Sequence, residues 1–95
     1  MEEQIRIRHP RSGEVLGVVE SMLGANKMRV RCQDDKMRLC RIPGKFRKSV
    51  WIKEGDIVLT EPWSIQGDEK GDIVFRYTQT QVAWLKRKNI LTMNL

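Results

Sequence analysis

Short runs in which apolar and polar residues alternate are the main pattern along this chain. The clearest run, KMRVRC at residues 27–32, places three cationic side chains on one face and three apolar side chains on the other. Alternation with a period of two residues is typical of a β-strand with one buried and one solvated face. Further strands are predicted at 36–42, where the alternation returns, and at 14–23, 56–63 and 71–78, which are rich in β-branched and aliphatic residues. Gly17, inside the strand predicted at 14–23, predicts a bulge or a sharp bend.

The segment QDDK connects the strand at 27–32 to the next one and predicts a tight hairpin turn. We place Asp34 and Asp35 at the two central positions, where positive φ is common and Asp is tolerated better than most residues. Pairing the strands about that turn sets Arg31 directly opposite Arg38. Like charges facing each other across a sheet are mildly destabilising, and a bound phosphate would relieve the repulsion. This register therefore predicts an anion-binding face.

The strand at 36–42 starts with the same alternation, which predicts Met37 and Leu39 inside and Arg38 outside. The parity then changes, so we expect a bulge near Cys40. In this register Cys40 does not face Cys32, which argues against a disulfide between them. Two thiols and a single distant histidine are also too few for a zinc site. We expect both cysteines to be reduced and buried, as in a reducing compartment.

A helix is predicted near the C-terminal end of the sequence. Thr78 and Gln81 have the spacing of a capping box, in which the two residues satisfy backbone N–H groups at the start of a helix. The following VAWLKRKN ends in cations, which complement the helix dipole. We expect Val82 and Leu85 to face the core and Trp84 to cover the edge of the barrel.

Five short strands and one terminal helix predict a single, mainly β domain. We interpret it as a five-stranded OB-fold barrel with a short C-terminal helix, and an SH3-like barrel is the competing architecture. The expected organisation is an N-terminal arm at residues 1–12, the barrel at 13–78, and the helix and tail at 79–95. A chain of 95 residues is too short for a second independent core.

Positive charge is concentrated in one part of the chain. The 18 Lys and Arg residues and the 12 Asp and Glu residues give a net charge of +6. Residues 27–53 hold ten bases and two acids, a net +8, whereas residues 54–78 hold six acids and two bases, a net −4. A solvated basic surface is the simpler alternative, but uniform solubilisation does not explain such a division. The distribution favours a site for a polyanion.

The candidate RNA-binding residues lie on the hairpin and in the segment that follows it. Phosphates attract cations independently of sequence, and Arg adds bidentate hydrogen bonding and stacking on bases. We interpret Trp51 mainly as a core residue, and Phe46 as either a core residue or a stacking platform. Because the predicted helix is short and partly buried, RNA with non-helical features is favoured over the DNA major groove. The full candidate set is Arg29, Arg31, Arg38, Arg41, Gly44, Lys45, Phe46, Arg47, Lys48, Trp51 and Lys53.

The sequence pattern favours a binding protein over an enzyme. His9 is the only histidine and lies in the N-terminal arm, where we expect it to be solvated. Turn chemistry explains Asp34 and Asp35, and the segment GDEKGD lacks the spacing of a calcium loop. We therefore expect no catalytic site, no cofactor and no metal. No apolar run has the length of a membrane span or a signal peptide, so we expect a cytoplasmic monomer.

Three segments of the chain together resemble translation initiation factor 1A of the archaeal type. They are RCQDDKMRLCRIPGKFRKSVWI at residues 31–52, GDIVL at 55–59 and DIVFRYT at 72–78. The pattern I-x-G-K-x-R-K at residues 42–48 also resembles the smaller bacterial initiation factor 1. The resemblance covers residues 13–88.

This resemblance implies an OB-fold that binds small-subunit ribosomal RNA at the aminoacyl-tRNA site. There it would keep initiator tRNA out of that site, cooperate with other translation initiation factors, and promote initiation-complex assembly and start-codon selection. Two positions depart from the family pattern, since Ser49 stands where many members have a third basic residue and Asp35 replaces a common turn glycine. The positions that match the family motif are Arg31, Arg41, Gly44, Lys45, Arg47, Lys48 and Trp51.

Two other functions stay open on the sequence. A free single-stranded RNA chaperone of the cold-shock type would use a similar barrel, but such domains display several aromatic side chains on their binding strands. The predicted strands at 27–32 and 36–42 contain no aromatic residue, which favours recognition of phosphates in folded RNA. A protein-docking role for the acidic residues 54–78 is a further alternative, as an additional activity.

Overall fold

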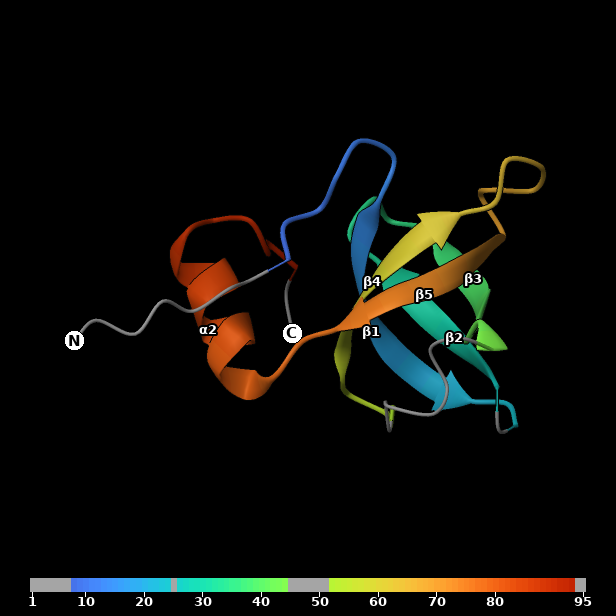
Figure 1. The fold of residues 1–95 in the computed structure, drawn as a ribbon, viewed down its shortest axis with the longest axis horizontal. Helices are drawn as coiled ribbons and strands as arrows, with labels where there is room; N and C mark the ends of the chain where they lie inside the picture. The colour runs from blue at the N-terminus through green and yellow to red at the C-terminus, as the bar shows by residue number, and fades with distance from the viewer. Residues whose placement is uncertain (1–7, 25, 45–51, 94–95) are drawn as a thin grey trace.

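A computed structural model describes residues 8–24, 26–44 and 52–93 of the chain. Its strands form a closed barrel in the spatial order β1-β2-β3-β5-β4. β3 and β5 run parallel, and every other neighbouring pair is antiparallel. A helix, α2, follows β5 and lies beside the barrel (Figure 1). The bounds are Val15–Met22 for β1, Lys27–Cys32 for β2, Met37–Arg41 for β3, Ile57–Pro62 for β4, Lys70–Arg76 for β5 and Gln79–Arg87 for α2.

This strand order, with β1 and β4 closing the barrel, is that of an OB-fold. The predicted mainly β architecture, an OB-fold with five barrel strands and a short C-terminal helix, is therefore confirmed in preference to an SH3-like barrel. The observed elements differ from the predicted ranges by a few residues at their ends, which is the usual uncertainty of element boundaries.

Two hydrophobic clusters lie on opposite faces of β1 and β4. Val19 and Val58 point into the barrel and pack there with apolar side chains of the other strands. Leu16 and Leu59, at the other parity, form a second cluster outside the barrel with Leu85 of α2. A strand that is buried on both faces carries a continuous apolar run in place of alternation, as both of these strands do. The helix thus completes the fold by covering the outer face of β1 and β4.

The N-terminus of α2 has the predicted capping box. The side chain of Thr78 accepts from the backbone N–H of Gln81, and the Gln81 side chain accepts from the backbone N–H of Thr78. The core positions are also confirmed, since Leu85 is fully buried and Val82 packs partly buried against the same cluster. Trp84 is partly buried and meets the ring of exposed His9 edge to face, at 5.3 Å between ring centroids.

Gly17 lets β1 approach β2 closely. A Cβ atom at this position would lie 2.5 Å from Cγ1 of Val30 and 3.0 Å from the carbonyl oxygen of Arg31. Any larger side chain would therefore push the two strands apart. The irregularity predicted around this glycine lies slightly further along, where the register with β2 shifts between Val19 and Ser21.

The β2–β3 hairpin differs from the prediction because its loop has three residues and not two. The N–H of Cys32 donates to the carbonyl of Lys36 at 2.9 Å, which leaves residues 33–35 as the loop. Within it, the N–H of Asp35 donates to the carbonyl of Cys32 at 3.0 Å. Asp35 has φ of 68°, in the left-handed region. A type I turn followed by one left-handed residue is the usual three-residue hairpin loop, and it moves the register by one position.

That shift inverts the faces of β3. Arg31 pairs with Met37, and Val30 pairs with Arg38, so the predicted opposition of Arg31 and Arg38 is wrong. Met37 is exposed and Arg38 is buried, the reverse of the expectation. The predicted bulge near Cys40 is also wrong, because β2 and β3 stay in register throughout. With the corrected parity, positions 38, 40 and 42 all face inward without any break.

Both cysteines lie in the cluster inside the barrel. Cys32 and Cys40 are buried and free, as predicted, and no disulfide joins them. Burial raises the pKa of the Cys40 thiol to about 12 and also raises the pKa of Cys32. Such thiols stay protonated at neutral pH and are poor nucleophiles, so they serve as small apolar core residues.

Matched substitutions of two methionines test the hairpin register. Met28 is fully buried and Met37 is about half exposed. We expect Met28→Ala to lower the free energy of unfolding by about 2–5 kcal/mol, and Met37→Ala to change it by less than about 0.5 kcal/mol. Urea denaturation of both variants measures the difference. A similar large loss for both would restore the two-residue turn, in which Met37 belongs to the core.

Candidate nucleic-acid interface

The outer face of the β2–β3 hairpin carries a row of cations. Alternation along β2 turns its basic side chains outward while the residues between them fill the barrel. β3 adds Arg41, which lies opposite Lys27 across the ladder. Lys27 and Arg41 are therefore like charges paired across the sheet, whereas the sequence predicted such a pair at Arg31 and Arg38. The cationic face consists of Lys27, Arg29, Arg31 and Arg41.

Two of these cations have acidic partners that a phosphate can replace. Nε of Arg31 lies 2.7 Å from a carboxylate oxygen of Glu20, and Nε of Arg41 lies 3.1 Å from one of Asp72. Both arginine side chains are about half exposed to solvent. Exposed ion pairs contribute little to stability, so exchanging either partner for a phosphate costs little. Arg29 is exposed and makes no ion pair with any residue that the structure describes.

A groove extends the cationic face from β2 toward α2. It has a volume of about 550 Å³, and Arg31, Lys53 and Lys86 are among the side chains that line it. Its apolar part includes Val18 and Ile57, which belong to the cluster beneath α2. The groove brings Lys53 to the hairpin, although more than twenty residues separate it from β2. Arg31 and Lys53, predicted cations from two distant segments, therefore line one groove together with the acids Glu54 and Asp56.

Lys53 is held at the rim of this groove by Asp56. Its backbone N–H donates to one carboxylate oxygen at 3.0 Å, and its ammonium group lies 3.3 Å from the other. Arg76 donates to the same carboxylate at 3.1 Å. Burial alone would raise the pKa of Asp56, but the hydrogen bonds from Lys53 and Arg76 outweigh it and lower the pKa. The carboxylate is therefore charged at neutral pH. Most of the Lys53 side chain is exposed to solvent.

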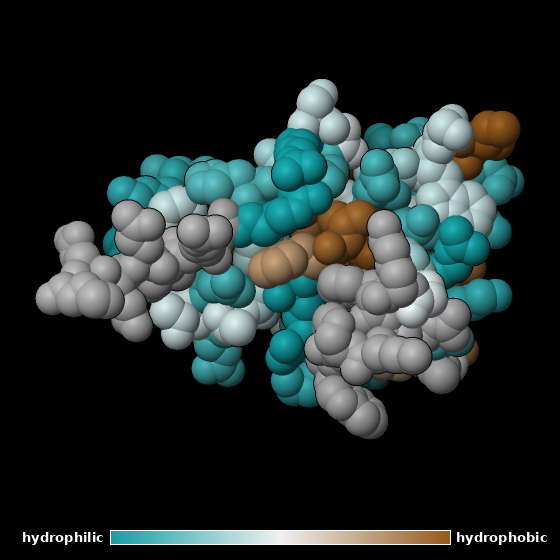
Figure 2. Space-filling model, viewed as in Figure 1, coloured by the Kyte–Doolittle hydropathy of each residue, from teal (hydrophilic) through white to brown (hydrophobic). Residues whose placement is uncertain are grey.

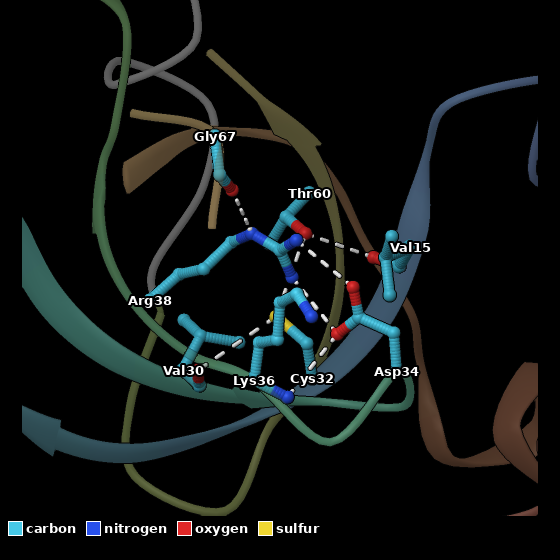
Figure 3. Close-up of polar contacts among 8 residues, drawn as sticks. All are labelled: Val15, Val30, Cys32, Asp34, Lys36, Arg38, Thr60 and Gly67. Atoms are coloured by element: carbon cyan, nitrogen blue, oxygen red, sulfur yellow. Dashed lines mark hydrogen bonds and ion pairs between the residues drawn. The ribbon is translucent and has the colours of Figure 1, made fainter. Parts of the chain in front are cut away.

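Arg38 does not belong to the cationic face, which corrects the prediction that it points outward. Its side chain is only 3% exposed. Nη1 and Nη2 donate to the two carboxylate oxygens of Asp34 at 3.0 and 2.9 Å, and Nε donates to the carbonyl of Gly67 (Figure 3). A guanidinium with this many partners is not free to bind phosphate. We therefore remove Arg38 from the RNA-binding set.

The Arg38 network fixes two loops at one end of the barrel. Asp34 lies in the β2–β3 loop and Gly67 in the β4–β5 loop, so one side chain connects both. Thr60 and Cys32 approach the same region (Figure 3), and Thr60 also donates to the carbonyl of Val15 at 2.9 Å. The hydrogen bonds from Arg38 lower the pKa of Asp34 below its usual value. Every buried polar side-chain atom of the described residues has a hydrogen-bond partner.

Several candidate residues fall in a segment that lies outside the described residues. These are Lys45, Phe46, Arg47, Lys48 and Trp51, and their roles stay predictions. Gly44 is exposed and directly precedes the segment. Arg41, the last residue of β3, lies three residues before Gly44 in the sequence.

Two further cations, Lys27 and Lys86, lie on these surfaces and are not in the candidate set predicted from the sequence. Lys27 belongs to the same outward face as Arg29 and Arg31, and the alternation of KMRVRC already contained that signal. Lys86 lies on α2 and lines the same groove as Arg31, an arrangement that depends on tertiary packing, so no local pattern could have indicated it. Among the described residues, neither a cluster of metal-binding side chains nor a helix able to span a membrane is present.

Loss of Asp34 would leave the buried guanidinium of Arg38 without its carboxylate. We expect Asp34→Ala to lower the free energy of unfolding by about 2–4 kcal/mol, somewhat less than a fully buried pair because about a third of Asp34 is exposed. In the double variant Asp34→Ala/Arg38→Met, most of that loss should be recovered, since no buried charge remains. Urea denaturation at neutral pH measures both.

The matched control is Glu20→Ala, which breaks the exposed pair with Arg31 and should cost less than about 1 kcal/mol.

Because the pKa of Asp34 is lowered in the folded state, the contribution of Asp34 to stability is present above the unfolded pKa and is lost as pH falls through the folded pKa. Asp34→Asn should therefore be less sensitive to acid than the parent chain. If the double variant is as unstable as Asp34→Ala, the pair is not what stabilises this end of the barrel.

Comparison with known proteins shows the family to which this chain belongs. The family model described as translation initiation factor 1A / IF-1 matches residues 2–95. The factor 1A of Pyrococcus abyssi is 56% identical over 91 residues, covering 96% of this chain and 80% of that protein. The factor 1A of Methanothermobacter thermautotrophicus is 53% identical over 92 residues, covering 97% and 93%.

Solved structures show the same barrel. The bacterial translation initiation factor 1 from the Wolbachia endosymbiont of Brugia malayi superposes with a TM-score of 0.53 at 33% identity, covering 70% of this chain and 79% of that one. YjeQ from Thermotoga maritima gives a TM-score of 0.56 at 27% identity over 68% of this chain, but only 23% of the YjeQ chain is covered. The match of the family model to almost the whole chain, together with identity above 50% to factors of comparable length, is decisive. The chain belongs to the translation initiation factor 1A / IF-1 family.

Proposed function

We propose that this protein binds small-subunit ribosomal RNA at the aminoacyl-tRNA site during initiation. There it keeps initiator tRNA out of that site and promotes initiation-complex assembly and start-codon selection together with other initiation factors. In this proposal it acts in the cytoplasm as a monomeric binding protein and carries out no chemical step. Family membership supports the initiation role, and the surface of the barrel supports the contact with RNA.

The observation that carries the proposal is the continuous cationic face. Arg29 and Arg31 lie side by side on β2, Arg41 joins them from β3, and the groove adds Lys53. The strands hold these side chains at fixed spacing, so binding does not have to order the backbone that carries them. Several cations on one rigid surface match a folded RNA, whose phosphates also come at fixed spacing.

The composition of this face favours phosphate contacts over base stacking. Between its cations, the side chains that point outward from β3 are Met37 and Leu39, and neither β2 nor β3 carries an aromatic residue. Proteins that hold unstructured single strands rely on rings that stack against successive bases. The hairpin therefore supports recognition of a folded RNA better than it supports the cold-shock type of chaperone.

Co-sedimentation tests this choice directly. Purified small and large archaeal ribosomal subunits are each centrifuged with the protein, and an unstructured oligonucleotide of equal concentration is added as a competitor. The proposal predicts recovery with the small subunit alone, and no release by the oligonucleotide. Preference for the oligonucleotide would support a free RNA chaperone, and equal binding to both subunits would contradict a specific site.

Removing one exposed cation should change the salt dependence of binding and not the stability. For Arg29→Ala we expect the slope of log K against log salt to become less negative by about 0.7–0.9, the contribution of one phosphate contact. The free energy of unfolding should change by less than about 0.5 kcal/mol, because the side chain is exposed. Filter binding to small subunits over a salt series, with urea denaturation alongside, provides both values.

Arg87→Ala is the matched control, since Arg87 is an exposed cation on the last turn of α2 and outside the cationic face. Its salt slope should stay that of the parent. If the two variants flatten the slope equally, net charge and not the hairpin face determines binding.

A further inference from the structure

The β4–β5 loop, residues 63–69, displays an apolar side chain at the far end of the barrel from α2. Ile65 is 77% exposed, more than any other large apolar residue of the described chain. Figure 2 shows an isolated hydrophobic surface, surrounded by hydrophilic surface, at the place where this loop projects in Figure 1. A single exposed aliphatic side chain is common on protein surfaces, so Ile65 indicates a contact only together with the hollow and the charges around it.

The loop that carries Ile65 is firmly held. The N–H of Trp63 donates to the carbonyl of Lys70 at 3.1 Å across its base, and the N–H groups of Glu69 and Lys70 both donate to the carbonyl of Gln66. The buried side chain of Arg38 donates to the carbonyl of Gly67 from below. Such a loop presents Ile65 in one position, which lowers the entropic cost of covering it.

A hollow of about 530 Å³ lies next to this side chain. Pro62, Trp63 and Ile65 provide its apolar part, with Arg41 and Asp72 at its side. The indole N–H of Trp63 donates to a carboxylate oxygen of Asp72 at 2.9 Å, and the guanidinium of Arg41 donates to the same oxygen at 3.1 Å. Arg41 also lies 5.2 Å from the centre of the indole ring. These contacts fix the ring, so the hollow has a defined shape.

The surroundings of the hollow are acidic. Residues 61–72 contain four acids and one base, a net −3, and Arg41 at the side of the hollow reduces the net charge of this region to −2. Glu61, Asp68 and Glu69 are exposed, and none of them forms an ion pair with another described residue. The single base, Lys70, has its ammonium group 5.6 Å from the Trp63 ring centre. Such a field repels phosphates and attracts cations.

We propose that the β4–β5 loop and its hollow form a docking surface for a basic protein segment that carries an apolar anchor. The anchor side chain packs on Ile65, Pro62 and Trp63, and flanking Lys or Arg residues meet Glu61, Asp68 and Glu69. An apolar centre with a charged rim is the usual anatomy of a protein–protein contact. RNA is disfavoured here because its phosphates would approach unpaired carboxylates.

The proposal assigns two different partners to two surfaces of one small barrel. The cationic face on β2 and β3 meets RNA, and the loop between β4 and β5 stays available to a protein. Arg41 lies at the boundary, because its ion pair with Asp72 turns it toward the hollow while its strand belongs to the hairpin. Neither surface requires the other, so the docking surface can be tested on the free protein.

Two-dimensional NMR of the uniformly ¹⁵N-labelled protein tests the proposal with defined probes. One probe is a short peptide with two central leucines flanked by lysines, and the other is a short RNA stem-loop. The indole N–H signal of Trp63, identified by its loss in Trp63→Phe, reports on the hollow because that group is hydrogen-bonded to Asp72. We expect the peptide to shift the signals of Trp63 and Ile65, and the RNA stem-loop to shift those of Arg29 and Arg31.

Two matched variants separate the anchor from general charge attraction. Ile65→Ser should weaken peptide binding about fivefold or more, as expected for a central anchor. Met37→Ser removes an exposed apolar side chain from the cationic face and should leave peptide binding unchanged. The same peptide with glutamates in place of lysines should not bind.

Other results would overturn the docking surface. These are a shift of the Trp63 signal by the RNA stem-loop, no shift with the lysine peptide at millimolar concentration, or equal peptide binding by Ile65→Ser and the parent. An RNA stem-loop that moves no signal of Arg29 or Arg31 would instead count against the proposed function, and the peptide result would still decide the docking surface.

Discussion

The register of the β2–β3 hairpin is the constraint on which the rest of this structure depends. In a strand pair, a shift of one residue exchanges the two faces completely. The three-residue loop that ends with Asp35 in the left-handed region sets that register, and it places Arg38 inside the barrel and Met37 outside. The same setting keeps Arg29 and Arg31 on the solvent face. One local turn thus decides which cations stabilise the barrel and which are available to a ligand.

The buried cation and the exposed cations have opposite roles. Arg38 is satisfied by Asp34 and by the carbonyl of Gly67, and it fixes two loops that are distant in the sequence. The cations of the outer face have weak or no partners among the described residues, so a phosphate can compete for them. Because the β4–β5 loop is fixed from below by Arg38, the apolar hollow beside it also depends on the hairpin register. Folding and recognition therefore rest on the same few hydrogen bonds.

Much of the fold could be predicted from the sequence because its signals are local. Alternation along KMRVRC and the capping box at Thr78 each involve neighbouring residues, and both are confirmed. The hairpin register could not be predicted, since two adjacent Asp residues suit a two-residue turn and a three-residue loop alike. Because of this ambiguity, the sequence predicts Arg38 on the outer face and a repulsion between Arg38 and Arg31. The structure shows neither. The groove cation Lys86 and the contact of Trp63 with Asp72 depend on tertiary packing, for which the sequence has no periodic signal.

Hydroxyl-radical oxidation of Met37, in the free protein and on small ribosomal subunits, tests the central claim most directly. The side chain is exposed on the cationic face, directly opposite Arg31 of β2, whereas Met28 is buried. We predict that Met37 is oxidised rapidly in the free protein and severalfold more slowly on the subunit, with Met28 slow in both. Slow oxidation of Met37 in the free protein would contradict the register, and an unchanged rate on the subunit would contradict the assignment of this face to RNA.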